Sequence, residues 1–259
     1  MLVYSYSFFA MNTRFVMVIP GLEEKRGEML ARRAEEIVEN WEQCLSAYRS
    51  GAELQVINSL ASEHSVVLSE PMIRVMDLCQ RYTRLTAGLF DPAVNQNKSS
   101  WRDVTLNLDQ GSIFFKRPGV KLDMGGVGKG IALEDVVSYF KSEGINDAFI
   151  SFGESSIAGM GKHPHGDGWL VGEEEGFLLR DAFISVSGPQ ELNPSGKEEK
   201  KAHIYHPLKQ ELIRTKKKVV VKCDSAVEAE ILSTCAYMAD EREFEQLKSQ
   251  FPSARWLKS

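Results

Sequence analysis

The chain has 259 residues, of which 43% are hydrophobic and 26% charged, and its formal net charge at pH 7 is -5. This composition excludes a largely disordered chain, and the length can bury the core of one large domain or two small ones. The negative charge argues against nucleic acid as the main partner, so we expect a small ligand or a protein.

The amino-terminal segment is predicted to form a β-hairpin from two β-prone runs, Val3 to Phe9 and Phe15 to Ile19. It has no basic region followed by a continuous apolar core, and no apolar run in the chain is long enough to span a membrane. With no transmembrane segment and neither a signal peptide nor a lipoprotein signal in the chain as given, we expect a cytoplasmic protein. The four cysteines are widely scattered without Cys-x-x-Cys spacing, which favours reduced thiols over disulfides or a zinc site.

Two amphipathic helices are predicted after the hairpin. In the first, apolar residues recur at helical spacing from Leu30 to Leu45, and the second begins near Pro71 and ends before Gly88. Such apolar stripes are typical of core-facing helices. The following Asp91 precedes a proline, so it could present its carboxylate to a ligand from an extended backbone, or close an Asx-type turn.

The segment from Leu122 to Gly130, with the sequence LDMGGVGKG, is the most informative in the chain. We expect it to join a strand, Val120 to Met124, to a helix, Ile131 to Phe140. Glycines allow close backbone approach to a ligand, and the first amides of a helix lack internal partners and favour negative charge. The segment therefore predicts a site for an anionic ligand, with a nucleotide as the first candidate.

Two familiar phosphate motifs do not match this segment. A Walker loop requires Ser or Thr after the lysine, whereas Lys129 is followed by Gly130, and the dinucleotide fingerprint requires a different glycine spacing. A turn whose glycines serve backbone geometry alone remains an equal alternative.

Short β-prone runs dominate the rest of the chain, at Ser112 to Phe115, Ala148 to Phe152, Trp169 to Gly172, Ala182 to Ser187 and Val219 to Cys223. Ser225 and Glu228 have the spacing of a capping box for a further helix. Residues 161–168 and 193–202 are predicted to be exposed loops. The expected fold is α+β, a single large domain over residues 1–259 with a mixed, mainly antiparallel sheet and packed helices.

Two groups of residues downstream could carry chemistry. Glu230 and Thr234 are four residues apart on the predicted helix, so they share a face and could ligate a hard cation such as Mg²⁺ near a phosphate, or could be ordinary surface residues. His203 and His206 could contact phosphate or transfer protons, although lone histidines more often serve structure. For His163 and His165, in a Gly- and Asp-rich loop, we favour solvent exposure over metal binding.

Taken in order, these segments resemble the ApbE-type flavin transferases, also called FAD:protein FMN transferases, across nearly the whole chain. The strongest matches are Gly88 to Val94, similar to Gly-Ala-Phe-Asp-Pro-Thr-Val, and Leu122 to Gly130, similar to Leu-Asp-Leu-Gly-Gly-Ile-Ala-Lys-Gly. Further matches are Met11 to Thr13, Leu45 to Asn58, Ser151 to Gly153, Ser187-Gly188, His203-Ile204 and Ala229 to Thr234.

The resemblance implies an ApbE-like fold and the transfer of FMN from FAD to a threonine hydroxyl of a client protein, with Mg²⁺ and with release of AMP. It implies FAD contacts from Met11, Tyr48, Leu89, Phe90, Asp91, Asp123, Lys129 and Ile204. It implies a magnesium site at Gly126, through its carbonyl, Glu230, Ser233 and Thr234. Asp123, Lys129 and His203 are the candidate catalytic residues, with the general base unassigned between Asp123, Glu230 and His203.

The chain departs from the family pattern at several of these positions. Glu230 stands where the family usually has Asp, Glu154 replaces the second glycine of a pair, and Val186 replaces a threonine. A catalytically eroded homologue that still binds flavin therefore stays open as an alternative. A second alternative is a FAD pyrophosphatase with the same site, in which water replaces the threonine and FAD gives FMN and AMP.

Overall fold

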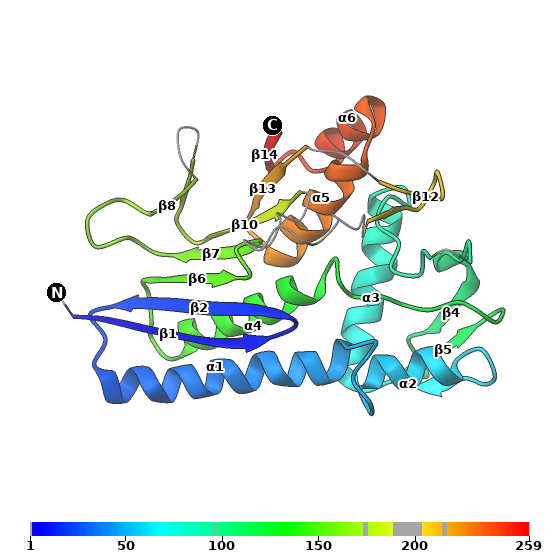
Figure 1. Cartoon of the computed structure of the whole chain (residues 1–259), viewed down its shortest axis with the longest axis horizontal. Helices are drawn as coiled ribbons and strands as arrows, with labels where there is room; N and C mark the ends of the chain where they lie inside the picture. The colour runs from blue at the N-terminus through cyan, green and yellow to red at the C-terminus, as the bar shows by residue number, and fades with distance from the viewer. Residues whose placement is uncertain (1, 96, 173–175, 189–203, 214–216, 259) are drawn as a thin grey trace, which may run out of the picture.

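The computed structural model describes residues 2–95, 97–172, 176–188, 204–213 and 217–258, and its centre is a seven-stranded sheet (Figure 1). Every neighbouring pair in this sheet is antiparallel. In sheet order the strands are β1 (Val3–Ala10), β2 (Thr13–Pro20), β6 (Ala148–Phe152), β7 (Ser156–Met160), β10 (Ala182–Ser187), β13 (Val219–Cys223) and β14 (Arg255–Lys258).

Among the described residues there are also three small antiparallel sheets. The first contains β3 (Val66–Val67), β5 (Ser112–Phe115) and β4 (Val104–Asn107), and the other two are the pairs β8 (Trp169–Val171) with β9 (Phe177–Leu179) and β11 (Tyr205–His206) with β12 (Glu211–Leu212). The predicted hairpin and the predicted downstream strands other than Val120 to Met124 are all present, and the fold class is confirmed as α+β with a mainly antiparallel sheet.

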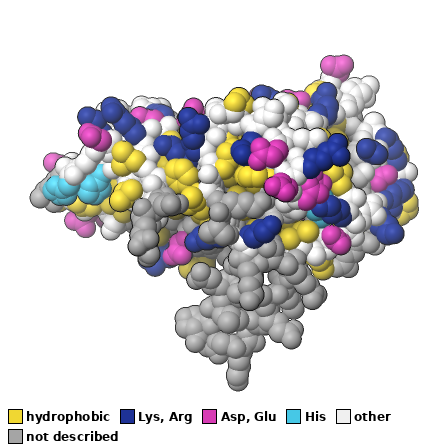
Figure 2. Space-filling view, turned by 90° about the horizontal axis from the view of Figure 1, so that it is seen from above, with side chains coloured by type: hydrophobic (Ala, Val, Ile, Leu, Met, Phe, Trp, Pro, Cys, Tyr) yellow, Lys and Arg dark blue, Asp and Glu magenta, His cyan; other side chains and the backbone are white. Residues whose placement is uncertain are grey.

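The helices are α1 (Glu24–Leu45), α2 (Glu53–Leu60), α3 (Glu70–Leu85), α4 (Gly128–Ser142), α5 (Ala226–Met238) and α6 (Glu241–Gln250), with a short 3-10 helix at Trp101–Asp103. Helix α1 packs against β1, α4 against β6 and β7, and α5 against β10 and β13, while α4 also contacts both α1 and α5. None of the helices in the described ranges is both long and apolar enough to cross a membrane. Basic and acidic side chains are interspersed on the face of the molecule in Figure 2.

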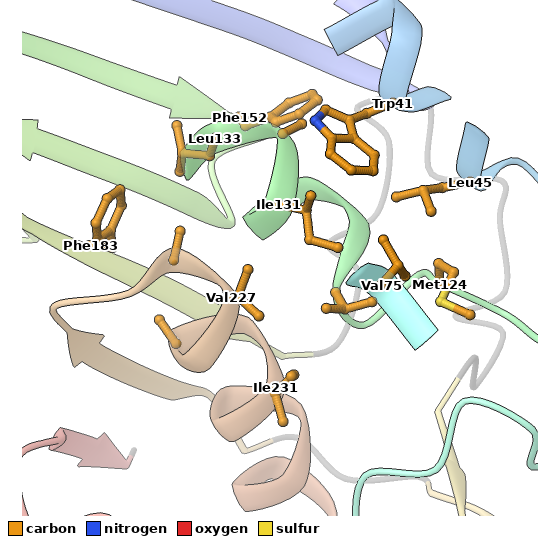
Figure 3. Packing of buried hydrophobic residues seen from close by; sticks show 14 of the residues in the cluster. Trp41, Leu45, Val75, Met124, Ile131, Leu133, Phe152, Phe183, Val227 and Ile231 are labelled. Atoms are coloured by element: carbon orange, nitrogen blue, oxygen red, sulfur yellow. The ribbon is translucent and has the colours of Figure 1, made fainter. Parts of the chain in front are cut away.

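The alternation of side chains along β10 separates two groups of buried residues. Phe183 belongs to the large core, whereas Ala182 and Ile184 belong to a smaller cluster with Trp169 of β8. Because successive side chains of a strand point to opposite faces, Ser185 and Ser187 lie on the same face as Phe183. Figure 3 shows side chains of α1, α4, α5 and the sheet meeting in the large core. Helices α4 and α5 thereby pack against each other.

The segment Val120 to Met124 is not a strand, so this part of the prediction is wrong. Leu122 donates its N–H to Asn58 Oδ1 at 2.7 Å and accepts from Asn58 Nδ2 at 2.9 Å, and Asp123 donates its N–H to the carbonyl of Pro92 at 2.8 Å. One asparagine side chain and a loop carbonyl satisfy the backbone groups that a strand neighbour would otherwise satisfy. Helix α4 also begins at Gly128, earlier than the predicted Ile131.

The predicted capping box at Ser225 is half formed. Ser225 Oγ accepts from the N–H of Glu228 at 3.1 Å, as predicted. The Glu228 carboxylate does not return to the cap and instead accepts from Tyr82 Oη at 3.0 Å. Tertiary contact with α3 therefore replaces the reciprocal half of the box.

Candidate functional site

A cavity lies where the β1–β2 turn, the carboxyl end of α1 and the amino end of α4 meet. It holds about 610 Å³, counting the part open to solvent, and is lined by residues 11–12, 42, 45–48, 123–125 and 128–129. Four residues predicted to contact FAD, Met11, Tyr48, Asp123 and Lys129, come together in its walls. Glu42 also lines the cavity, and the sequence motifs gave no signal for it.

The β1–β2 turn presents Met11 to this cavity from a strained backbone. Ala10 pairs with Thr13, so the turn has only two residues, and Met11 and Asn12 have φ angles of 47° and 60°. Left-handed angles at both central positions are those of a type I′ hairpin turn, in which Asn is favoured but Met is costly. Strain of this kind is held in place by the flanking strands and often accompanies functional sites.

Asp123 lines the cavity and lies in a turn of the chain. Its Oδ1 accepts from the N–H of Gly125 at 2.7 Å, an Asx-type turn, and the residue is exposed. The second carboxylate oxygen is the part of Asp123 that remains available to a ligand or a proton.

Lys129 and Glu230 form an ion pair at the amino end of α4. The distance from Lys129 Nζ to Glu230 Oε1 is 2.7 Å, and Glu230 Oε2 accepts from the N–H of Gly130 at 2.5 Å. The Glu230 side chain is 5% exposed and that of Lys129 is 23% exposed. Val127, at the N-cap position of α4, provides no side-chain cap. A carboxylate from α5 therefore caps α4 in place of a local residue.

The capping is reciprocal, because a carboxylate from α4 also caps α5. Glu134 Oε1 accepts from Ser225 Oγ at 2.6 Å and from the N–H of Val227 at 3.1 Å. Each helix thus satisfies free amides at the amino end of the other. The two helices can do this only if their amino ends lie in close contact.

Gly130 makes that close contact possible. A Cβ at this position would lie 2.9 Å from the carbonyl oxygen of Ala226 and 2.9 Å from the Cα of Val227. At Gly128 the nearest atom would be a flexible leucine methyl at 3.4 Å, and at Gly126 the nearest atoms would be at 3.8 and 4.0 Å. Gly130 therefore serves helix packing. A Cβ at Gly126, in contrast, would make only ordinary van der Waals contacts.

The neighbours of Gly126 are Phe90 and the hydroxyl of Thr234. Thr234 Oγ1 lies 3.5 Å from Ser187 Oγ. Ser233 is fully buried, with Oγ 2.9 Å from Ser185 Oγ and 2.9 Å from Ser187 Oγ. The four residues matched to a magnesium site therefore gather where α5 faces the glycine segment. The Ser233 hydroxyl is already engaged in hydrogen bonds with Ser185 and Ser187.

The segment after α3 is more buried than its predicted ligand role suggested. Leu89 and Phe90 are 3% and 6% exposed. The Asp91 carboxylate accepts from the N–H groups of Ala93 and Trp101, at 2.9 to 3.0 Å, which is the Asx-type alternative left open by the sequence. Burial is the main cause that raises the pKa of Asp91 above its usual value. In this structure the carboxylate supports its own loop.

The candidate histidines have different surroundings. His203 lies outside the described residues. His206 is fully buried, with Nδ1 accepting from the N–H of Lys209 at 3.3 Å and Nε2 at 3.4 Å from Glu243 Oε2, so it serves to attach β11 to α6. Ile204, half-buried, accepts from the N–H of Ile213.

The loop between β7 and β8, which carries His163 and His165, lies at one end of the molecule (Figure 1). There His163 packs edge-on against Trp169. Over the part of the chain that the structure describes, no three His, Cys, Asp or Glu side chains are grouped closely enough to hold a metal by themselves.

The sequence model of the ApbE family matches residues 11–255. Two proteins named FAD:protein FMN transferase, from Klebsiella pneumoniae (strain 342) and Chlamydia muridarum (strain MoPn / Nigg), are 23% and 24% identical to this chain over 206 and 204 residues. These alignments cover 70% and 68% of this chain and 62% and 64% of the relatives. The chain thus spans less than two thirds of the length of these curated relatives.

Three solved structures have the same fold. The flavin transferase ApbE from Vibrio cholerae has a TM-score of 0.82 at 18% identity, over 99% of this chain and 93% of that chain. The ApbE protein from Thermotoga maritima has a TM-score of 0.81 at 20% identity, over 99% and 94%. The apo form of the Pseudomonas stutzeri flavinyl transferase ApbE has a TM-score of 0.83 at 16% identity, over 100% and 94%.

Proposed function

Because the chain belongs to the ApbE family, we propose that it is a FAD:protein FMN transferase that acts as one domain over residues 1–259. In the proposed reaction FMN passes from FAD to a threonine hydroxyl of a client protein, with Mg²⁺ as cofactor and AMP as the second product. The observation that carries the proposal is the cavity at the amino end of α4, which gathers Met11, Tyr48, Asp123 and Lys129 from three distant segments.

The cavity offers the chemistry that a flavin nucleotide requires. The Lys129 ammonium and the amino end of α4 favour phosphate groups, while Met11 and the exposed ring of Tyr48 offer an apolar and an aromatic surface to a flavin. Leu89, Phe90, Asp91 and Ile204 are proposed as further contacts.

The residues at the amino end of α4 and on α5 also fit a magnesium ion by their donor chemistry. Glu230, Thr234 and the carbonyl of Gly126 are oxygen donors, and Mg²⁺ commonly completes its shell with water and substrate phosphates. We propose these three as ligands, with Ser233 holding Thr234 in place through Ser187. The fit requires Lys129 to leave Glu230 Oε1. When bound, the ion would neutralise negative charge on the phosphates.

The chemical step in this proposal is a phosphoryl transfer. The threonine oxygen forms a bond to the phosphorus of the FMN half, the anhydride bond to the other phosphate breaks, and AMP leaves with the bridging oxygen. Lys129 stabilises charge on the phosphates, which is the main contribution of a protein to such reactions. The hydroxyl proton passes to a base. Of the candidates Asp123, Glu230 and His203, Asp123 lines the cavity with one carboxylate oxygen free of the Asx turn.

Incubation with FAD, with and without Mg²⁺ and a candidate client, tests the proposal. We expect magnesium-dependent AMP release and covalent flavin fluorescence on the client. AMP and free FMN with an unlabelled client would instead indicate a FAD pyrophosphatase. Tight FAD binding without turnover, with client present, would indicate an eroded flavin-binding homologue, and no FAD binding would contradict all three functions.

The strained turn supplies a separate prediction for Met11. We expect Met11→Gly to raise the free energy of unfolding by about 0.5–1 kcal/mol, because glycine adopts a positive φ without a Cβ clash. We also expect weaker FAD binding, because the thioether no longer lines the cavity. Urea unfolding and titration of flavin fluorescence measure the two effects.

Lys98→Gly is the matched control, since Lys98 is exposed, has a φ of 56° and does not line the cavity. It should gain similar stability with unchanged FAD affinity. If Met11→Gly binds FAD as tightly as the wild type, Met11 is not a contact.

A further inference from the structure

The Lys129 ammonium lies where a bound cation would need the same carboxylate. It is 2.7 Å from Glu230 Oε1, and the other carboxylate oxygen is held by the N–H of Gly130. The carboxylate is almost fully withdrawn from water, while Lys129 lies partly in the cavity wall. The charge of Glu230 is therefore balanced from the cavity side by a flexible side chain.

A buried carboxylate requires a compensating cation, and Glu230 has one in Lys129. A divalent cation on Oε1 would lie within a few ångströms of the ammonium in its present position. Like charges at that separation oppose each other strongly, above all where water is excluded. Lys129 and a divalent cation are thus alternative partners of Glu230 Oε1.

Once a phosphate-bearing ligand occupies the cavity, the Lys129 ammonium has a second partner with which it can pair. Lysine is a compact charge on a flexible four-carbon stem, so the ammonium can change partner without a change in the helix. Phosphates at the amino end of α4 would face both the helix amides and this ammonium. A ligand that draws Lys129 into the cavity leaves Glu230 Oε1 free.

We propose that Lys129 is an exchangeable counterion that couples the binding of a divalent cation to the binding of the nucleotide. In the ligand-free protein it neutralises Glu230 and opposes the cation. In the complex it pairs with the phosphates, and the cation takes its place. This inference rests on the proposed function for the identity of the nucleotide. By linkage, FAD and the divalent cation each increase the affinity of the protein for the other.

The rest of the cation site does not depend on Lys129. Ser233 is fixed by Ser185 and Ser187, and Ser187 lies 3.5 Å from the Thr234 hydroxyl. The movement of one side chain therefore decides whether the donor set is complete.

Calorimetric titration of Mg²⁺ into the full chain tests the proposal, using wild type and Lys129→Met, each with and without FAD. We expect Lys129→Met to bind Mg²⁺ about tenfold more tightly than wild type without FAD, because the competing ammonium is gone. We expect FAD to raise the Mg²⁺ affinity of the wild type about tenfold, and that of the variant by less than about twofold. Chromatography before and after each titration establishes that the FAD is intact.

Thermal unfolding provides a readout that needs no nucleotide. Without Mg²⁺, the Tm of Lys129→Met should fall by about 5–10 °C, because the buried Glu230 loses its counterion. Added Mg²⁺ should restore more of the Tm in the variant than it adds to the wild type. Lys129→Gln, which is neutral and polar, repeats the measurement if the methionine variant does not fold.

Lys141→Met is the matched control, because Lys141 lies in the last turn of the same helix and 56% of its side chain is exposed. Its Mg²⁺ affinity should equal that of the wild type. Equal or weaker Mg²⁺ binding by Lys129→Met would overturn the proposal, as would the absence of Mg²⁺ binding to both proteins with and without FAD.

Failure of the proposed function would look different. Coupled binding of Mg²⁺ and FAD with neither AMP release nor labelled client would remove the transferase function and keep the exchange of Lys129. Magnesium-dependent transfer with no change of Mg²⁺ affinity in Lys129→Met would keep the function and remove the exchange.

Discussion

Glu230→Gln is expected to lower the free energy of unfolding by about 2–3 kcal/mol, measured in urea without Mg²⁺. The amide oxygen can still accept from the N–H of Gly130, but the amide NH₂ group faces the Lys129 ammonium, which loses its partner. Removing one partner of a buried ion pair costs about 3–5 kcal/mol, and we reduce this figure because the Lys129 side chain is 23% exposed.

Glu134→Gln is the matched control for this change. Glu134 caps α5 as Glu230 caps α4, but its two hydrogen bonds come from a hydroxyl and an amide rather than from a cation. The loss should be about 1 kcal/mol or less, because the glutamine oxygen keeps both bonds. Equal losses in the two variants would show that capping, rather than the ion pair with Lys129, gives Glu230 its effect.

The double variant Lys129→Met with Glu230→Gln gives a further test of the ion pair. It should be more stable than Glu230→Gln alone, because no unpaired charge remains buried. If the free energy of unfolding of the double variant is below that of the wild type by the sum of the losses in the two single variants, the pairing of Lys129 with Glu230 is contradicted.

Gly130→Ala is expected to lower the free energy of unfolding by about 2 kcal/mol and the Tm by about 4–8 °C. The added Cβ would meet backbone atoms of Ala226 and Val227 at 2.9 Å, so α4 and α5 must separate. Overpacking of this kind costs about 1–3 kcal/mol, and here the obstacle is backbone, which places the cost at the upper end. The better helix propensity of alanine offsets about 1 kcal/mol.

Gly128→Ala makes the same chemical change two residues earlier in the same helix. The Cβ at position 128 would be 3.4 Å from a Leu45 methyl, which can move. We therefore expect the free energy of unfolding of Gly128→Ala to be no more than about 0.5 kcal/mol below that of the wild type, or to be higher. Differential scanning calorimetry compares the two variants. If Gly130→Ala is as stable as Gly128→Ala, helix packing does not explain Gly130.

Local patterns were sufficient to predict most of the elements. Helical spacing identified α1 and α3, and the β-prone runs identified five of the seven strands of the central sheet together with β5 and β8. Strands β7 and β14 of the central sheet were not predicted. Helix α2 has only Leu54 and Ile57 buried, too few positions to give a clear period. The apparent strand at Val120 to Met124 failed because its backbone bonds come from the side chain of Asn58, which is 64 residues away.

The candidate site was predictable as a set of residues but not as an arrangement. Lys129 and Glu230 were each singled out, yet sequence spacing does not show that they form an ion pair across the α4–α5 contact. Gly130 was attributed to close approach of a ligand or to turn geometry, whereas the close approach is that of another helix. For Asp91 the sequence left two alternatives, and the N–H groups of Ala93 and Trp101 favour the turn.

The reciprocal caps of α4 and α5 also bear on the order of folding. Gly130 and Glu230 are 100 residues apart, so their contact closes a long loop whose entropy must be lost before the contact contributes. Until α5 docks, the amino end of α4 lacks the Glu230 cap and Lys129 lacks its carboxylate. A nascent or partly unfolded chain therefore lacks both the α4 cap and the proposed cation site, so we expect cation binding there only in molecules that have completed their core.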